Sequence, residues 1–335
     1  MRWTLPIWIF SWLQTAALVS EPVFVCHTPN SVLRREHECK ELYAGCRARL
    51  ATCSDVAWLP DGSGFLGLEK LDESIWMYAF DGELSIPLRY ISKQDGLRIK
   101  HPEKLTFSPD GEFLVVASYA CLQFFPFKNN QLFTKPLYSI REKGGNTIHD
   151  VAFSTDGAYL AYSVIDVPGS ICFCRKEKGR YAPVSSVPNP MFPLRPKALI
   201  FSPDDRFVII GFSYCVSKKI REETASMLAV YPFDPVEGTM GEIPVSHVFL
   251  SGGIEALALS SDQGMIYSAD QVTDQILRHS FDPVTGALGI GEVALKNPES
   301  HLSFPRGLSF SPDGKFLAVS NYGNDTITIY ETELE

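Results

Sequence analysis

The sequence lacks the short motifs that mark most enzyme classes. It contains no nucleophile elbow, no Gly-rich phosphate loop, no His-Glu-x-x-His motif and no EF-hand loop. These absences argue against most hydrolase, kinase and metalloprotease interpretations. A cationic stripe is also missing, because the net charge is −9 and the Lys and Arg residues are scattered. Phosphate binding needs clustered cations, so we expect no nucleic-acid partner.

Paired Cys-x-x-Cys motifs are absent too, although the chain has eight cysteines. Four of them crowd the stretch before residue 54: Cys26, Cys39, Cys46 and Cys53. His27 and His37 lie among these thiols, but the spacing is not that of a zinc site, and we predict no metal and no cofactor. In an oxidising compartment the four thiols could form two disulfides, in any of three pairings. Cys172 and Cys174 alternate on an expected strand and read as core residues.

Residues 1–20 carry a single charge, Arg2, before an apolar stretch that Pro6 and Gln14 interrupt. The stretch is too short and too interrupted for a stable membrane span. It is typical of a secretory signal peptide, which would make the protein secreted or periplasmic. The alternative is a segment that docks on the fold of a cytoplasmic protein.

A short phrase returns six times along the rest of the chain: an apolar strand followed by a Ser/Pro-Asp-Gly turn. The copies centre on Asp61, Asp110, Asp156, Asp204, Asp262 and Asp313, at steps of 46 to 58 residues. Pro presets one φ angle of the turn, Asp caps the backbone, and Gly accepts a positive φ, so each copy predicts a hairpin.

Apolar runs on both sides of these turns supply further strands, and four strands in about 50 residues make one propeller blade. The sequence therefore predicts an all-β propeller with six visible repeats in residues 53–335. Residues 21–52 form a Cys-rich segment that closes the ring or contributes a partial seventh blade. Because the chain stops soon after Tyr330, the last repeat needs an outer strand from the N-terminal side, and we expect Val23–Val25 or the region around Leu42 to supply it.

In each copy, one position lies four residues before the last apolar residue of the strand that precedes the turn. The residue at this position is ionisable in five of the six copies. The six positions hold Ser54, Glu103, His149, Lys197, Glu255 and Arg306. Because strands alternate with period two, charge at this position suggests that the strand has emerged into solvent at the rim of the central channel. The ring could bind a carboxylate or phosphate, or its charges could only neutralise one another. His149 is the best candidate for acid/base work.

The segment Pro305–Asn321 closely resembles a blade of the bacterial lactonase-type propellers, and Phe281–Leu288 is similarly typical of them. The resemblance spans about residues 50–332. WD repeats are a poorer match, because their Gly-His and Trp-Asp signatures are missing from this sequence. It implies a fold that usually has seven blades, and a family that includes 6-phosphogluconolactonase-like and muconate-lactonizing-type enzymes as well as surface and periplasmic propellers of no known catalysis.

The resemblance also implies a functional pair, a His before the turn of one blade and an Arg in the next. His149 matches the first, whereas the second falls on Lys197, and Gly211–Ser213 holds no counterpart of the family's acidic residue. Our leading hypothesis from the sequence is a non-catalytic propeller that binds a small anionic ligand or a protein partner at the channel mouth. The alternative is a lactone hydrolase that uses His149 and Glu255 as catalytic residues, with Lys197, Arg306 and Glu103 binding the ligand.

Overall fold

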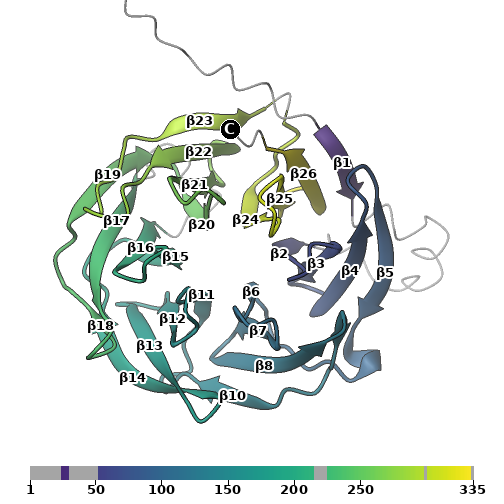
Figure 1. The fold of residues 1–335 in the computed structure, drawn as a ribbon, viewed down its shortest axis with the longest axis horizontal. Coiled ribbons are helices and arrows are strands. Elements are labelled where there is room, and N and C mark those ends of the chain that lie inside the picture. Colours follow the sequence, from purple (N-terminus) through teal and green to yellow (C-terminus); the bar gives the residue numbers. More distant parts are fainter. Residues whose placement is uncertain (1–23, 30–51, 215–224, 298–299, 333–335) are drawn as a thin grey trace, which may run out of the picture.

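The computed structural model describes residues 24–29, 52–214, 225–297 and 300–332. These residues form six antiparallel sheets arranged as a ring, which Figure 1 shows along its axis. In the described ranges the only helix is the 3-10 turn η1 (Lys93–Asp95). The predicted all-β propeller of four-stranded blades is confirmed.

Within each blade the strands follow chain order from the centre of the ring to its outside, except that the outermost strand of blade 6 comes from the other end of the chain. Blade 1 contains β2 (Cys53–Trp58), β3 (Gly64–Glu69), β4 (Ser74–Phe80) and β5 (Ser85–Ile91). Blade 2 contains β6 (Lys104–Phe107), β7 (Phe113–Ser118), β8 (Cys121–Lys128) and β10 (Tyr138–Arg141), with β9 (Gln131–Leu132) paired to β8. Blade 3 contains β11 (Ile148–Phe153), β12 (Tyr159–Val164), β13 (Ser170–Glu177) and β14 (Arg180–Pro188).

The second half of the ring repeats this plan. Blade 4 contains β15 (Arg195–Phe201), β16 (Phe207–Ser213), β17 (Ala225–Asp234) and β19 (Ser246–Ser251), with β18 (Thr239–Met240) paired to β17. Blade 5 contains β20 (Ile254–Leu259), β21 (Met265–Asp270), β22 (Gln275–Ser280) and β23 (Glu292–Lys296). Blade 6 contains β24 (Pro305–Phe310), β25 (Phe316–Asn321), β26 (Thr326–Glu331) and, from the other end of the chain, β1 (Phe24–Pro29).

Blade 6 joins the two ends of the chain, because β1 pairs antiparallel with β26 from Phe24 opposite Tyr330 to Pro29 opposite Thr326. The sequence led us to expect a strand here from the N-terminal side. Each inner strand contacts the inner strand of the next blade, and β24 contacts β2, so the ring closes with six blades (Figure 1). The possible seventh blade is therefore not part of the described ring, since the strand from residues 21–52 completes the sixth.

The repeated turns have the expected geometry. In blade 2, the Ser108 hydroxyl accepts the Phe113 N–H and donates to Asp110 Oδ1 at 2.5 Å. Four of the six copies place Gly in the left-handed region, for example Gly111 at φ 69°. The other two place Asp205 (φ 56°) and Gln263 (φ 63°) there. The turn thus keeps its shape even where Gly is replaced.

The hydrophobic core consists of six clusters, and each lies between two neighbouring blades. The cluster between blades 3 and 4, for instance, packs Phe173 of blade 3 against Phe233 of blade 4. A single blade cannot cover its own apolar faces, so stacking around the ring is what buries them. Cys172 and Cys174 are buried in the cluster between blades 2 and 3, as predicted.

Several predictions about the N-terminal region fall outside the described residues. These are the signal peptide at 1–20 and the disulfides, since Cys39, Cys46 and the side chain of Cys26 are not described. Cys53 is buried at the start of β2. Within the described ranges, no helix is both long enough and apolar enough to cross a membrane.

Candidate functional site

A β-bulge occurs at the same place in the inner strand of five blades. The bulged residues are Ser54, His149, Lys197, Glu255 and Arg306. In blade 2, Glu103 comes just before β6 and donates its N–H to the carbonyl of Ala117 at 2.9 Å. A bulge interrupts the alternation of a strand and re-aims one side chain. The five bulges and Glu103 therefore present one residue per blade at the same level of the channel.

The structure brings all five predicted site residues into one hydrogen-bonded group. Glu255 lies at its centre: Oε1 accepts from Lys197 Nζ at 2.9 Å, and Oε2 lies 3.2 Å from His149 Nε2 and 3.4 Å from Arg306 Nε. Arg306 also donates to Glu103 Oε2 at 2.6 Å, which links blade 6 to blade 2 across the channel. Ser54 instead donates to the carbonyl of Leu68 at 3.3 Å.

These residues are buried, so the prediction that they reach solvent at the rim is wrong. The exposed fractions are 1% for His149 and Glu255, 5% for Glu103 and 7% for Lys197 and Arg306. The prediction assumed regular alternation along the strand, whereas the bulge turns the side chain towards the axis. Charge at these positions is tolerated because the groups pair with one another.

Three further residues belong to the group and were not predicted. Lys70 pairs with Glu103, Gln271 Nε2 donates to Glu255 Oε1 at 2.6 Å, and the ring of Tyr322 lies 4.9 Å from the guanidinium of Arg306. Each comes directly after the second strand of its blade. This recurrence is visible in the sequence and could have identified them. We call Lys70, Glu103, His149, Lys197, Glu255 and Arg306 the channel cluster.

His149 is held in one tautomer by the backbone. Its Nδ1 lies 2.7 Å from the carbonyl oxygen of Lys197, which can only accept, so Nδ1 carries the proton. Nε2 then faces the centre of the cluster, 3.3 Å from both Lys197 Nζ and Arg306 Nη2. Burial and the charge of Lys197 lower the pKa of His149 to about 4. At neutral pH the ring is uncharged, and the lone pair of Nε2 can accept a hydrogen bond from Lys197 Nζ or Arg306 Nη2.

The two carboxylates of the cluster are ionised. Burial alone would raise the pKa of Glu103, but Arg306 foremost, with His149 and Lys70, lowers it to about 2. Burial is likewise outweighed at Glu255, where Lys197 and then His149 hold the pKa well below its usual value. With His149 neutral, three cations face two carboxylates, and the cluster has one net positive charge.

A second set of buried charges lies one residue further along the inner strands. Asp55, Lys104 and Asp150 come from blades 1, 2 and 3, and we call them the Asp–Lys–Asp layer. Lys104 Nζ lies 3.5 Å from Asp55 Oδ1 and also donates to the carbonyl of Arg306. Each aspartate also accepts a backbone N–H from the next blade at 2.8 Å: Asp55 accepts that of Leu105, and Asp150 accepts that of Leu199. Asp150 thus ties blades 3 and 4 together rather than orienting His149.

The pKa values in this layer shift upward. Burial raises the pKa of Asp55 despite the charge of Lys104, and it raises that of Asp150 to about 7. In the described part of the chain, no three His, Cys, Asp or Glu side chains lie together as metal ligands would.

Comparison with known proteins identifies the family. The family model described as "Lactonase, 7-bladed beta-propeller" matches residues 142–335. The chain belongs to this lactonase propeller family. Its described residues form six blades, one fewer than the family's description gives. Among curated proteins, none matches the chain by sequence.

Solved structures share the fold of this lactonase-type propeller at low sequence identity. The periplasmic gluconolactonase PpgL of Pseudomonas aeruginosa is 17% identical with a TM-score of 0.54, over 73% of this chain and 71% of its own. A Bacteroides uniformis protein assigned as a 6-phosphogluconolactonase is 16% identical with a TM-score of 0.58, over 86% and 83%. Hydrazine synthase of Kuenenia stuttgartiensis is 14% identical with a TM-score of 0.61, over 87% and 98%. The fold alone therefore does not indicate the reaction.

Proposed function

We propose that this protein hydrolyses a lactone that carries an anionic group, and that the reaction takes place at the channel cluster. The observation that carries the proposal is the convergence of Glu255, Lys197 and Arg306 on the unprotonated Nε2 of His149. Membership of the lactonase family and the gluconolactonase names of two structural neighbours support it.

The geometry supplies the parts that ester hydrolysis needs. Lys197 and Arg306 are donors that can stabilise the oxyanion formed when water attacks the lactone carbonyl. Nε2 of His149 takes the proton of the attacking water and returns it to the ring oxygen as the C–O bond breaks. Water and lactone thus become one hydroxy acid. The net positive charge of the cluster favours a substrate with a phosphate or carboxylate.

The test is hydrolysis of 6-phosphogluconolactone and of uncharged γ- and δ-lactones, measured above the spontaneous rate. We expect faster turnover of the phosphorylated substrate, and a kcat/KM about 10²–10⁴-fold lower in His149→Ala. Lys197→Ala should mainly raise KM for the phosphorylated substrate. The exposed residues His247 and Lys143 provide matched controls as His247→Ala and Lys143→Ala, which should behave as wild type.

The pH profile adds an independent reading of His149. Its pKa of about 4 predicts that kcat/KM rises with pH through that value and is level towards neutrality. Turnover no faster than the spontaneous rate, or unchanged by His149→Ala, would contradict the catalytic proposal.

A second candidate is a propeller that binds an anion without converting it. One observation favours it: each charged group of the cluster already has an ionic or hydrogen-bonding partner, so the cluster is stable as it stands. Calorimetric titration with 6-phosphogluconate distinguishes the two. Binding that Lys197→Ala weakens, in a protein with no lactonase turnover, would support this candidate and reject the first.

A further inference from the structure

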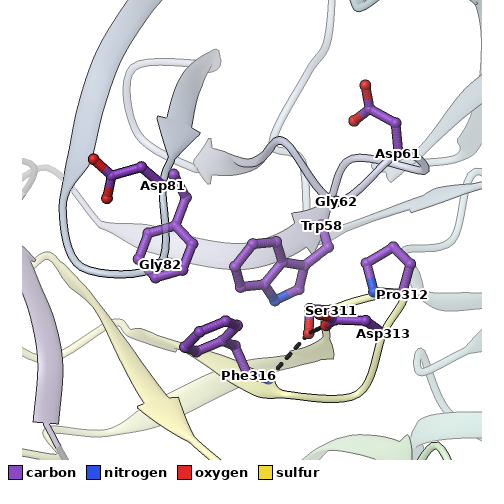
Figure 2. Close-up of a pocket in the computed structure, with 10 residues that line it drawn as sticks. Trp58, Asp61, Gly62, Asp81, Gly82, Ser311, Pro312, Asp313 and Phe316 are labelled. Carbon is purple, nitrogen blue, oxygen red and sulfur yellow. Dashed lines mark hydrogen bonds between the residues drawn. The ribbon is translucent and has the colours of Figure 1, made fainter.

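A cavity of about 320 Å³ lies between blades 6 and 1, at the end of the inner strands opposite to the channel cluster. Trp58, Phe80 and Phe316 form its apolar wall, and Asp61, Asp81 and Asp313 lie at its edge. Figure 2 shows Asp61 and Asp81 on opposite sides of Trp58. The volume is large enough for a small organic group.

Trp58 lines this cavity and has an unsatisfied donor. The residue is 5% exposed, and its Nε1 is buried with no acceptor among the described residues. The nitrogen lies on the edge of the ring that faces Ser311 and Pro312, which also line the cavity (Figure 2). A buried N–H is rarely left without a partner. An oxygen atom of a bound molecule that reaches this edge of the ring would supply the missing acceptor.

The junction between blades 3 and 4 shows what fills this kind of site elsewhere in the protein. Tyr159 begins the second strand of blade 3, as Phe316 begins the second strand of blade 6. Phe233 lies near the end of the third strand of blade 4, as Phe80 does in blade 1, and the two aromatic rings are in contact at both junctions. There Arg175 lies over the Tyr159 ring, with its guanidinium 5.3 Å from the centroid. It donates to the Tyr159 hydroxyl at 2.7 Å and to the carbonyl of Val236 in the next blade.

The junction between blades 6 and 1 has the opposite charge at the corresponding place. Arg175 is opposite Tyr159 in the strand register, and the residue opposite Phe316 is Glu331. Lys315, in the turn that lines the cavity, is directed to Asp313 at 3.7 Å and has a side chain 60% exposed. The junction between blades 6 and 1 thus has the aromatic rings and carboxylates, but Glu331 stands where the junction between blades 3 and 4 has Arg175.

We propose that this cavity binds a guanidinium group from outside the chain, carried by an arginine residue of a peptide or by free arginine. The guanidinium takes the place that Arg175 has between blades 3 and 4, against the aromatic wall and beside the carboxylates of Asp81 and Asp313. An oxygen of the same ligand accepts the Nε1–H of Trp58. The site is separate from the channel cluster and independent of lactone hydrolysis.

Calorimetric titration with three probes tests the proposal: Nα-acetyl-arginine amide, the corresponding citrulline amide, and free arginine. Citrulline is uncharged and nearly isosteric, so we expect its affinity to be at least about tenfold lower. Tighter binding of the capped arginine than of free arginine would identify a peptide as the source, and the reverse would identify free arginine. Butylguanidine, which has no oxygen, should be less affected than capped arginine by Trp58→Phe.

Two further variants change the charge of the site. Asp81→Asn should weaken binding about fivefold. Its matched control is Asp234→Asn at the junction between blades 3 and 4. Asp234 accepts two backbone N–H groups in the turn after the third strand of blade 4, and Asp81 does the same in blade 1. Glu331→Arg should place an internal guanidinium in the cavity and abolish binding, with no loss of stability. Equal binding of citrulline and arginine, no binding of any probe at millimolar concentration, or undiminished binding by Glu331→Arg would overturn the proposal.

Discussion

The channel cluster and the Asp–Lys–Asp layer are neighbours along the same inner strands, yet their buried carboxylates shift in opposite directions. Arg306, Lys197 and Lys70 outnumber the carboxylates of the cluster and lower the pKa values of Glu103 and Glu255. In the layer, Lys104 faces two carboxylates, and burial raises the pKa values of both. Burial alone therefore does not decide the charge of a carboxyl group here. The local ratio of cations to carboxylates does.

The difference predicts two pH ranges for stability. Glu103 and Glu255 have lowered pKa values in the folded state, so they stabilise the fold above their unfolded pKa, and this contribution falls away as the pH drops further. Asp150 has a raised pKa of about 7, so its contribution is complete below its unfolded pKa of 3.8 and is lost as the pH rises through 7.

The largest effect should follow Arg306→Ala, which removes the cation shared by Glu103 and Glu255. Two carboxylates then remain buried with less compensation, and we expect a loss of about 3–5 kcal/mol in the free energy of unfolding at pH 7. Urea denaturation measures it. Arg89→Ala, at an exposed position on β5, should change stability by less than about 0.5 kcal/mol. A loss at Arg306 no larger than this control would show that the cluster does not depend on its cations.

Lys104→Met should cause the second-largest loss in the free energy of unfolding. It removes the cation of the Asp–Lys–Asp layer. Without the ammonium, Asp55 lacks its ionic partner and the carbonyl of Arg306 lacks a donor, at a level where burial already raises both Asp pKa values. We expect a loss of about 2–3 kcal/mol at pH 8 and a smaller loss at pH 5, where the protonated carboxyl of Asp150 no longer needs the cation. An equal loss at both pH values would contradict this account of the layer.

Asp150→Asn should alter the pH dependence more than the stability itself. The wild type should lose about 1–3 kcal/mol between pH 5 and pH 8 as Asp150 ionises, and the variant should lose less, because Asn does not titrate. Since Asn can accept only one of the two N–H groups that Asp150 accepts, the variant should be the less stable of the two at pH 5. Parallel stability curves for the two proteins would show that Asp150 is not the titrating group.

Most of the fold could be predicted from the sequence, because the turn motif recurs and the pattern of apolar runs around it is local. The level at which His149, Lys197 and Arg306 meet could also be predicted, since they occupy equivalent positions. Their burial could not, because a bulge depends on the register with the next strand. The cavity beside Trp58 was missed for a similar reason. A Trp at a position where four other repeats have Phe is visible in the sequence, but Glu331 of blade 6 comes near this Trp only once the ring closes.

Lys70→Met should have the smallest effect, and it separates the edge of the channel cluster from its centre. The Lys70 side chain is 21% exposed, and its partner Glu103 keeps Arg306, so water and the guanidinium compensate for most of the loss. We expect a change of about 0.5–1 kcal/mol at pH 7. The pKa of Glu103 should rise from about 2 towards its usual value, which moves the onset of acid unfolding to higher pH. Acid titration followed by circular dichroism checks this shift. A loss as large as that of Arg306→Ala would place Lys70 at the centre of the cluster rather than at its edge.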